Sequence, residues 1–224
     1  MATDLNVFIT FHQLIKWSNI EAHPFGPFMF RNKLQSGIIS LLCGSGLDPL
    51  KLWGVHGKGC IKRITDKDVQ TLAIEITAAQ FCTTCISLPR DKKNVIGIRL
   101  PYLTLNIKYL KLPFCFEFEV LDSRMTKRRF RLSNAQSGET RKTLLCHIPL
   151  ALEEGWNNIQ IDLFHFTRMA YGTDFVELQR LEIYANCRIR RIFISDRWYK
   201  EEELPKDYIM KKPTKLTRSI LRKD

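Results

Sequence analysis

Apolar and polar residues alternate over many short stretches of this chain, and such alternation is typical of β-strands. Residues 158–163, 180–185 and 192–194 each place an apolar side chain at every second position. Because successive side chains of a strand point to opposite faces, each stretch predicts a strand with one face on a core. The region between residues 155 and 205 therefore contains at least three strands, with one short helix expected at 164–170.

The rest of the chain continues the pattern at intervals of roughly 8–12 residues, which indicates a sandwich or barrel of antiparallel strands. Further strands are predicted at 38–42, 50–55, 60–65, 71–77, 81–87, 95–100, 103–108, 114–121, 127–132 and 143–148. We therefore expect an all-β, single-domain β-sandwich or jelly roll with one short helix.

One hairpin can be predicted in register. With Leu121 opposite Lys127, two apolar pairs face one way and two ionic pairs face the other, whereas a slip of one residue would break both sets. The predicted pairs are Phe118–Phe130, Phe116–Leu132, Glu119–Arg129 and Glu117–Arg131. If these ionic pairs are exposed, each contributes only about 0–1 kcal/mol.

Composition divides the chain into three parts. Of the net charge of +12, residues 1–28 contribute −1, residues 29–210 contribute +8 and residues 211–224 contribute +5. We interpret 1–28 as an N-terminal extension, 29–210 as the β-sandwich domain and 211–224 as a basic, flexible tail. A body this basic favours an acidic partner.

The cysteines and the N-terminus indicate an intracellular protein. Seven cysteines, an odd number spread over predicted strands, are typical of free thiols in a reducing compartment. No signal peptide or membrane-spanning stretch is predicted, so no membrane partner is expected. Cys82 and Cys85 have metal-ligand spacing but no second ligand pair, and the five histidines share no motif. We expect no metal, no cofactor and no catalytic site.

Basic side chains are the candidate binding residues. Arg188, Arg190 and Arg191 have no acidic neighbour in the sequence, and Lys62 and Arg63 form a second basic group. We expect these residues on the surface, in contact with an acidic partner. Reversing the charge of Arg188 and Arg191 should then abolish binding and change thermal stability little.

Several segments resemble the cilia- and flagella-associated protein 20 family. They include ANCRIRR (185–191), RMAYGT (168–173), SDRWYKEEELP (195–205), MFRNKLQSG (29–37) and LDSRMTKRRFRLSN (121–134). The resemblance covers about 29–212, is looser at 39–60 and 78–94, and leaves 1–28 as an addition, so the chain looks like a divergent paralogue as much as a direct counterpart.

The resemblance implies a small β-sandwich similar in fold to carbohydrate-binding modules. It also implies a structural, non-catalytic role at the inner junction of ciliary doublet microtubules. There such proteins sit on tubulin beside the parkin co-regulated protein and help to close the B-tubule. The implied locations are the cytoplasm, the cytoskeleton, the axoneme of cilia and flagella, and the basal body.

Two other functions stay open at this point. A sequence pI of about 9.5 and the basic tail also fit a nuclear, nucleic-acid-associated protein, although no recognition helix is evident. Trp53, Trp156 and Trp198 could serve an intracellular carbohydrate-binding module, since sugar sites on sandwiches use exposed aromatic platforms.

Overall fold

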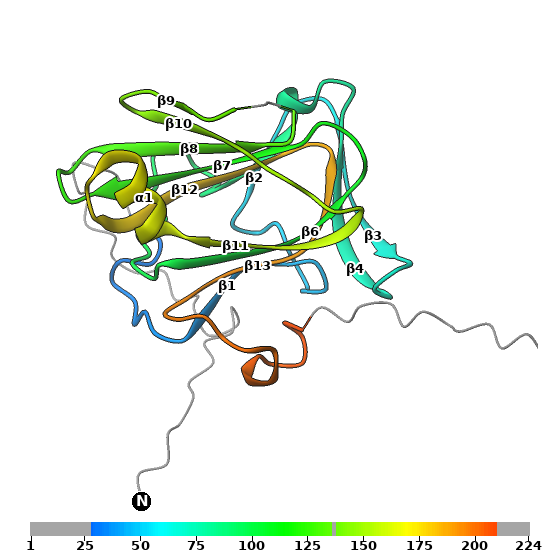
Figure 1. The fold of residues 1–224 in the computed structure, drawn as a ribbon. Helices are drawn as coiled ribbons and strands as arrows, with labels where there is room; N and C mark the ends of the chain where they lie inside the picture. The colour runs from blue at the N-terminus through cyan, green and yellow to red at the C-terminus, as the bar shows by residue number, and fades with distance from the viewer. Residues whose placement is uncertain (1–27, 136–137, 210–224) are drawn as a thin grey trace, which may run out of the picture.

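Two β-sheets pack face to face in the computed structural model, which describes residues 28–135 and 138–209 (Figure 1). The first sheet has the strand order β11-β6-β13-β4-β3, and β1 also pairs with β13. The bounds of its strands are β1 Ile38–Cys43, β3 Cys60–Asp66, β4 Thr71–Thr77, β6 Tyr102–Tyr109, β11 Gly155–Asp162 and β13 Cys187–Ser195. We call it the six-stranded sheet.

The second sheet has seven strands in the order β2-β5-β12-β7-β8-β10-β9. Their bounds are β2 Gly54–His56, β5 Cys85–Leu88, β7 Cys115–Asp122, β8 Lys127–Ser133, β9 Thr140–Arg141, β10 Leu145–Pro149 and β12 Phe175–Tyr184. Apolar side chains from both sheets fill the space between them, among them Leu105 and Ile192 of the six-stranded sheet and Phe118 and Phe130 of the second sheet. The predicted all-β sandwich with one helix is confirmed.

Strand β13 lies at the centre of the six-stranded sheet. It pairs with β6 on one side; on the other side it pairs first with β4 and then with β1. The register with β6 shifts between Ile189 and Arg191, so Arg190 is an extra residue of the kind found in a β-bulge. Side chains of a regular strand alternate between its two faces, so residues three apart would point to opposite faces. The extra residue shifts this alternation, and Ile189 and Ile192 are therefore both buried in the core.

The hairpin of β7 and β8 has the predicted register. Phe118 lies opposite Phe130 and Glu117 lies opposite Arg131. The two phenylalanine rings stack with their centroids 4.9 Å apart. Glu117, however, is buried rather than exposed, so its ion pair with Arg131 is not the exposed pair that the sequence suggested.

The helix α1, Leu163–Tyr171, closes one end of the sandwich, at the left of Figure 1. Its first turn is capped by Asp162, whose carboxylate accepts a hydrogen bond from the His165 backbone N–H at 2.9 Å. The helix ends at Gly172, which has a φ of 64° and so adopts the left-handed conformation that favours glycine. Phe166 and Tyr171 pack edge-on against Phe130.

Three predicted strands differ from the structure. Residues 95–100 form only isolated bridges, because Gly97 has a φ of 71° and interrupts the extended backbone. Residues 50–53 form a turn, which leaves only Gly54–His56 as β2. Residues 81–83 form a short 3-10 helix before β5. The buried side chains of 95–100 still contribute to the core, so their apolar character reflects burial without strand pairing.

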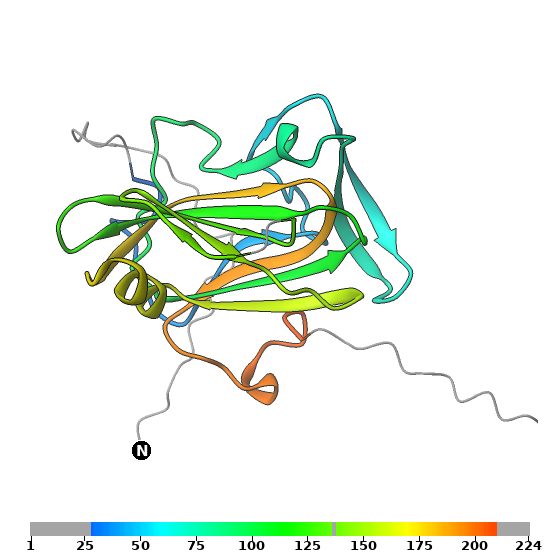
Figure 2. The same ribbon diagram turned by 45° about the horizontal axis from the view of Figure 1, so that its top comes forward.

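After β13 the chain crosses the outer face of the six-stranded sheet. These residues, 196–209, are called the C-terminal segment, and Figure 2 shows it below the sandwich in orange. Trp198 contacts Tyr102, and Tyr208 contacts Phe193. The predicted extension 1–28, apart from Phe28, and the predicted tail 211–224 lie outside the described residues. Among the described helices, none has the length and apolar character to cross a membrane.

Candidate functional site on the outer face of the six-stranded sheet

Arg188 lies in a cluster of paired charges rather than free on the surface. Its Nη1 donates to Asp66 Oδ2 at 2.7 Å and its Nε donates to Glu75 Oε2 at 2.6 Å. Lys108 Nζ donates to Asp66 Oδ2 at 2.9 Å, and Trp156 Nε1 donates to Asp66 Oδ1 at 3.1 Å. We call these five residues the Asp66 cluster; they join β3, β4, β6, β11 and β13.

The register of the strands explains why these side chains meet. Lys62 lies opposite Glu75 across β3 and β4, and Arg188 lies opposite Glu75 across β4 and β13. Arg188 also faces Lys108 across β13 and β6. Directly opposed side chains project from the same face of a sheet. The outer face therefore brings Lys108 and Arg188, which lie elsewhere in the sequence, next to Lys62, Asp66 and Glu75 of the hairpin formed by β3 and β4.

Burial and hydrogen bonding act in opposite directions on the carboxylates of the cluster. Burial of Asp66, which is fully inaccessible, would raise its pKa, but hydrogen bonds from Lys108, Arg188 and Trp156 outweigh this and hold the pKa below its ordinary value. The pKa of Glu75 is lowered in the same way, because Arg188 and Lys62 offset the desolvation. Both carboxylates are therefore ionised near neutral pH.

Arg191 is also held by the chain itself. It is buried, with 6% of its surface exposed, and its guanidinium hydrogen-bonds Ser40 Oγ and Cys43 Sγ. The same guanidinium lies over the Tyr208 ring, 4.0 Å from the centroid. Arg190 is half-buried and donates to the Asp207 carbonyl at 2.9 Å. Burial and the neighbouring charge of Arg191 lower the pKa of Arg190.

The five predicted binding residues thus fall into two groups. The expectation that Arg188 has no acidic neighbour is wrong, because the fold supplies Asp66 and Glu75. Arg188, Arg190 and Arg191 are engaged within the molecule, and Arg191 is buried rather than on the surface as expected. Lys62 and Arg63 are exposed. Contact of any of the five with a partner stays a prediction.

Exposed cations gather along the edge strand β3. Lys58, Lys62, Arg63 and Lys67 are all exposed, and we call them the β3 basic edge. Lys62 pairs with Glu75 at 3.2 Å, while the other three make no ion pair with any described residue. The nearby acids do not neutralise them, because Asp66 is bound by Lys108 and Arg188 and Asp68 by Lys108. The edge lies at the right of Figure 1.

The cysteines show no catalytic or metal-binding arrangement within the described part of the chain. Cys82 is exposed in the 3-10 turn and Cys85 is buried in β5; burial raises the pKa of the Cys85 thiol to about 11, so it stays protonated near neutral pH. No group of three or more His, Cys, Asp or Glu residues that could hold a metal occurs among the described residues.

The tryptophans suggested for sugar binding have three different environments. Trp53 is buried in the core and donates its indole N–H to the Leu41 carbonyl at 2.9 Å. Trp156 is half-buried and belongs to the Asp66 cluster. Trp198 is 41% exposed. Among these three, the only side chain that offers an exposed ring is therefore Trp198.

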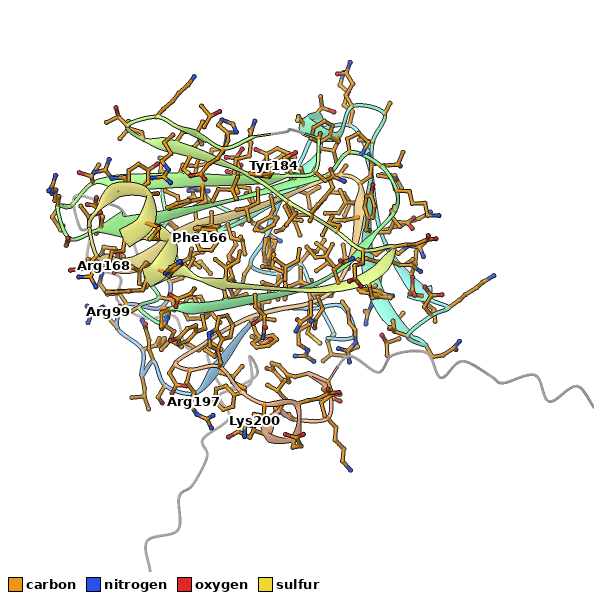
Figure 3. All side chains as sticks on the ribbon, in the orientation of Figure 1. Arg99, Phe166, Arg168, Tyr184, Arg197 and Lys200 are labelled. Atoms are coloured by element: carbon orange, nitrogen blue, oxygen red, sulfur yellow. The ribbon has the colours of Figure 1, made fainter. Side chains whose placement is uncertain are left out.

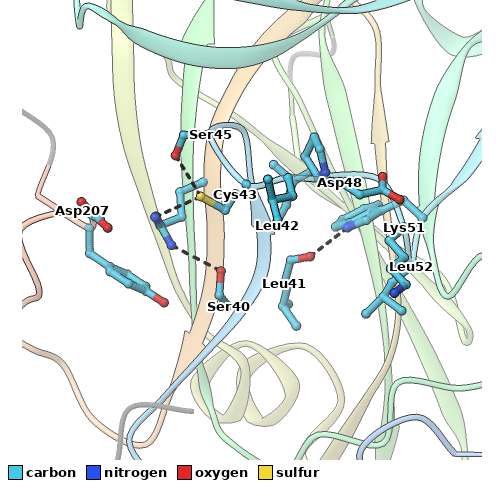
Figure 4. A pocket seen from close by; sticks show the side chains of 15 residues that line it. Ser40, Leu41, Leu42, Cys43, Ser45, Asp48, Lys51, Leu52 and Asp207 are labelled. Carbon is cyan, nitrogen blue, oxygen red and sulfur yellow. Dashed lines mark hydrogen bonds between the residues drawn. The ribbon is translucent and has the colours of Figure 1, made fainter. Parts of the chain in front are cut away.

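A largely apolar pocket of about 590 Å³ lies beside Arg191 (Figure 4). Its lining includes Leu41, Leu42, Leu52 and Tyr208. Arg191 reaches it from β13, held by Ser40 and Cys43 as the dashed lines show. Arg191 thus forms part of the pocket lining, and its guanidinium is covered by Ser40, Cys43 and Tyr208.

One family of known proteins matches nearly the whole described part of this chain. The CFA20 domain family matches residues 29–212. The chain belongs to the cilia- and flagella-associated protein 20 family.

Curated members of this family are similar over most of their length. The chain is 50% identical to cilia- and flagella-associated protein 20 of Paramecium tetraurelia and 48% identical to that of Chlamydomonas reinhardtii, in each case over 80% of this chain and 95% of the relative. It is 44% identical to the protein of the same name from Caenorhabditis elegans, over 80% of this chain and 89% of the relative. Family members thus match the sandwich as a whole.

Carbohydrate-binding modules are among the solved structures that match this chain. A family 11 module of a Clostridium thermocellum cellulase matches 75% of this chain and 99% of its own, with 10% identity and a TM-score of 0.41. The same module in complex with a mixed-linked tetrasaccharide matches with a TM-score of 0.40.

In this member of the family, sequence reasoning missed Asp66, Glu75 and Lys108. One signal for Glu75 was present. Residues 60–66 and 71–77 are joined by four residues, and the hairpin this predicts places Lys62 opposite Glu75, as observed. Asp66 and Lys108 had no such signal, because they meet Arg188 through pairings between strands that are remote in the sequence.

Proposed function

We propose that this chain is a non-catalytic structural component of ciliary and flagellar axonemes that binds tubulin at the inner junction of doublet microtubules and supports cilium assembly and motility. The observation that carries the proposal is membership of a family whose curated relatives are named cilia- and flagella-associated proteins, with 44–50% identity over 80% of the chain. The proposed neighbours are tubulin and a protein like the parkin co-regulated protein. The proposed locations are the axoneme and the basal body.

The β3 basic edge supports a contact with tubulin, which is strongly acidic. Three of its four cations are free of ion pairs with described residues; Arg63 lies in β3, and Lys58 and Lys67 lie just beyond its two ends. The Asp66 cluster ties β3 to four other strands. The cations are therefore presented in a fixed arrangement, which favours an oriented contact over general attraction.

The repeating lattice of a microtubule can raise the apparent affinity of a small protein for tubulin. For a contact that buries about 1,200–1,600 Å² in total, the affinity depends on how well shape and charge match rather than on the buried area. A protein that bridges two adjacent protofilaments gains further from effective concentration, by about 10²–10⁴ where the geometry permits. A stiff sandwich with its binding residues on one sheet suits such a bridge.

Charge reversal on the β3 basic edge tests the proposal. The double substitution Lys58→Glu with Arg63→Glu should weaken co-sedimentation with doublet microtubules at least tenfold, because neither side chain has a partner within the described chain. The matched control is Arg99→Glu with Arg168→Glu, which makes the same change in net charge at the opposite end of the molecule (Figure 3). It should bind as the unmodified chain does.

Two outcomes would contradict the proposal. One is equal binding of both double variants and the unmodified chain to doublets, with both variants folded by circular dichroism. The other is a tagged copy that stays diffuse in ciliated cells. Tighter binding to DNA or RNA than to tubulin at matched salt would favour the nuclear alternative, since phosphate binding falls steeply as salt increases.

A further inference from the structure

A second pocket lies between the six-stranded sheet and the C-terminal segment. It has a volume of about 370 Å³. Its floor is the outer face of β6 and β11, with Thr104, Asn106, Asn158 and Gln160, and its wall includes Trp198 and Glu201. We call it the polar pocket. The side chains of the Asp66 cluster do not line it.

The charge of the polar pocket is opposite to that of the molecule. The chain carries 35 Lys and Arg against 23 Asp and Glu, yet among the described residues no Lys or Arg lines this pocket, and the charged residue in its lining is Glu201. Glu201 is exposed and its carboxylate makes no hydrogen bond or ion pair with a described residue. An anion would therefore meet repulsion here, and a cation would find a free carboxylate.

A buried acceptor points to the same ligand chemistry. Asn106 is 2% exposed; its amide N–H donates to Asn158 Oδ1 at 2.8 Å. Its own Oδ1 is buried and accepts no hydrogen bond from the described residues. Because a buried polar atom without a partner is costly, a ligand that donates to Asn106 Oδ1 would gain from it.

Trp198 adds an aromatic surface to the pocket. One side of its ring packs on Tyr102, with the centroids 4.4 Å apart, and 41% of the residue stays exposed. Tryptophan attracts cations to its ring face more strongly than other aromatic residues. A free carboxylate, a buried acceptor and an exposed indole together suit an ammonium or a guanidinium group.

We propose that the polar pocket binds a basic side chain, lysine or arginine, that a partner protein presents. The interaction goes beyond the proposed binding to tubulin, because it uses another site and the opposite charge. Its failure would leave the tubulin contact of the β3 basic edge unaffected, and the reverse also holds. The partner is thus a protein with an exposed basic segment rather than the acidic surface of the lattice.

The test measures binding of a small probe to the full chain. Nα-acetyl-arginine methylamide is titrated while the indole N–H of Trp198 and the side-chain amide of Asn106 are followed by NMR. The Trp198 resonance is assigned from the spectrum of Trp198→Phe. A single side chain should bind with a Kd of about 1 mM. The citrulline analogue, which has nearly the same shape and no charge, should bind at least about tenfold more weakly.

Neighbouring glutamates provide matched variants. Glu201→Gln removes the charge that lines the pocket and should weaken binding of the arginine probe by about fivefold to tenfold. Glu202→Gln makes the same change one residue away, at an exposed position that does not line the pocket, and should leave binding unchanged. Lys211→Gln with Lys212→Gln should also leave it unchanged if the natural ligand comes from a partner.

Each opposite result overturns the proposal. Equal binding of the citrulline and arginine probes, or tighter binding of the neutral disaccharide cellobiose, would assign the pocket to uncharged ligands. If Glu201→Gln and Glu202→Gln weaken binding of the arginine probe equally, the probe responds to the net charge of the protein and not to the pocket. Probe binding that becomes several-fold tighter in the Lys211 and Lys212 variant would show that this chain's own C-terminal residues occupy the pocket. A probe that moves neither resonance would show that no such site exists.

Discussion

At the scale of single residues, the cross-strand partner decides what a charged side chain can do. The sequence predicted that Arg188 and Arg63 would both contact an acidic partner. Arg188 meets Asp66 and Glu75, and its pKa is raised because their hydrogen bonds and charges outweigh the effect of burial. Arg63 is exposed on the edge strand and has no acidic partner among the described residues. Only the second of them is free to bind another molecule without first breaking internal pairs.

Asp66→Asn is predicted to lower the free energy of unfolding by about 3 kcal/mol at pH 7, because it removes the fully buried carboxylate that Arg188 and Lys108 share. In the unmodified chain the pKa of Asp66 is lower when folded than when unfolded. Its contribution is therefore complete above the ordinary carboxyl pKa and is lost as the pH falls below about 4 towards the folded pKa. Urea unfolding between about pH 3 and pH 7 measures both effects.

The control is Asp68→Asn, which removes a carboxylate bonded to the same Lys108 but 46% exposed. We expect it to change stability by less than about 1 kcal/mol and to preserve the loss of stability in acid. Equal destabilisation by both substitutions would show that the burial of Asp66 is not what makes it important.

At the scale of elements, sequence reasoning succeeded where two independent patterns agreed. The register of β7 and β8 was predictable because apolar and ionic pairs specified the same alignment. The helix α1 was predicted at 164–170 and is observed as Leu163–Tyr171. Residues 95–100 have the composition of a strand, yet Gly97 breaks the extended backbone and leaves only isolated bridges. Composition alone could not distinguish a paired strand from an apolar segment that is buried without strand pairing.

The candidate site was less predictable than the fold for a topological reason. Arg188 meets Asp66 and Glu75, which precede it by 122 and 113 residues, and no local pattern specifies which strands become neighbours. The bulge at Arg190 could not be predicted from the sequence either. It is the reason that Arg188 and Arg191 face outward while Ile189 and Ile192 face the core. The exposed residues Lys62 and Arg63 could be identified because β3 and its polar pattern are local.

Arg188→Gln should loosen β3 and β4 while the opposite sheet stays intact. Removing the guanidinium leaves Asp66 and Glu75 with fewer donors, and β3 is an edge strand with one neighbour. We expect amide hydrogen exchange in β3 to rise by about tenfold or more, with exchange at Phe118 and Phe130 unchanged. Arg129→Gln is the control, because its pairs are long and half-exposed. A uniform rise in all strands would contradict this local role.

At the scale of the whole molecule, the six-stranded sheet presents two surfaces of different character. The β3 basic edge offers free cations, and the polar pocket under the C-terminal segment offers a carboxylate and an exposed indole. A protein that joins two different neighbours needs two such surfaces at a fixed separation. The sandwich provides the fixed separation, since β13 lies between β4 and β6 and the Asp66 cluster connects the strands around it.

Salt dependence distinguishes an oriented contact from attraction by net charge. Lys58→Glu with Arg63→Glu and Arg99→Glu with Arg168→Glu both lower the net charge by the same amount, so attraction governed by net charge would weaken equally in both. The Debye length is about 10 Å at 0.1 M salt, so charges farther than this from the partner are already largely screened, and the remaining salt dependence comes from exposed cations that lie against the partner. Binding to polymerised tubulin between about 0.05 M and 0.3 M salt should therefore show a smaller salt slope for the β3 variant than for the Arg99 and Arg168 variant, because the β3 variant has lost its close pairs. Identical slopes in the two variants would show that the position of the charges on the sandwich does not matter and that the β3 basic edge is not the contact.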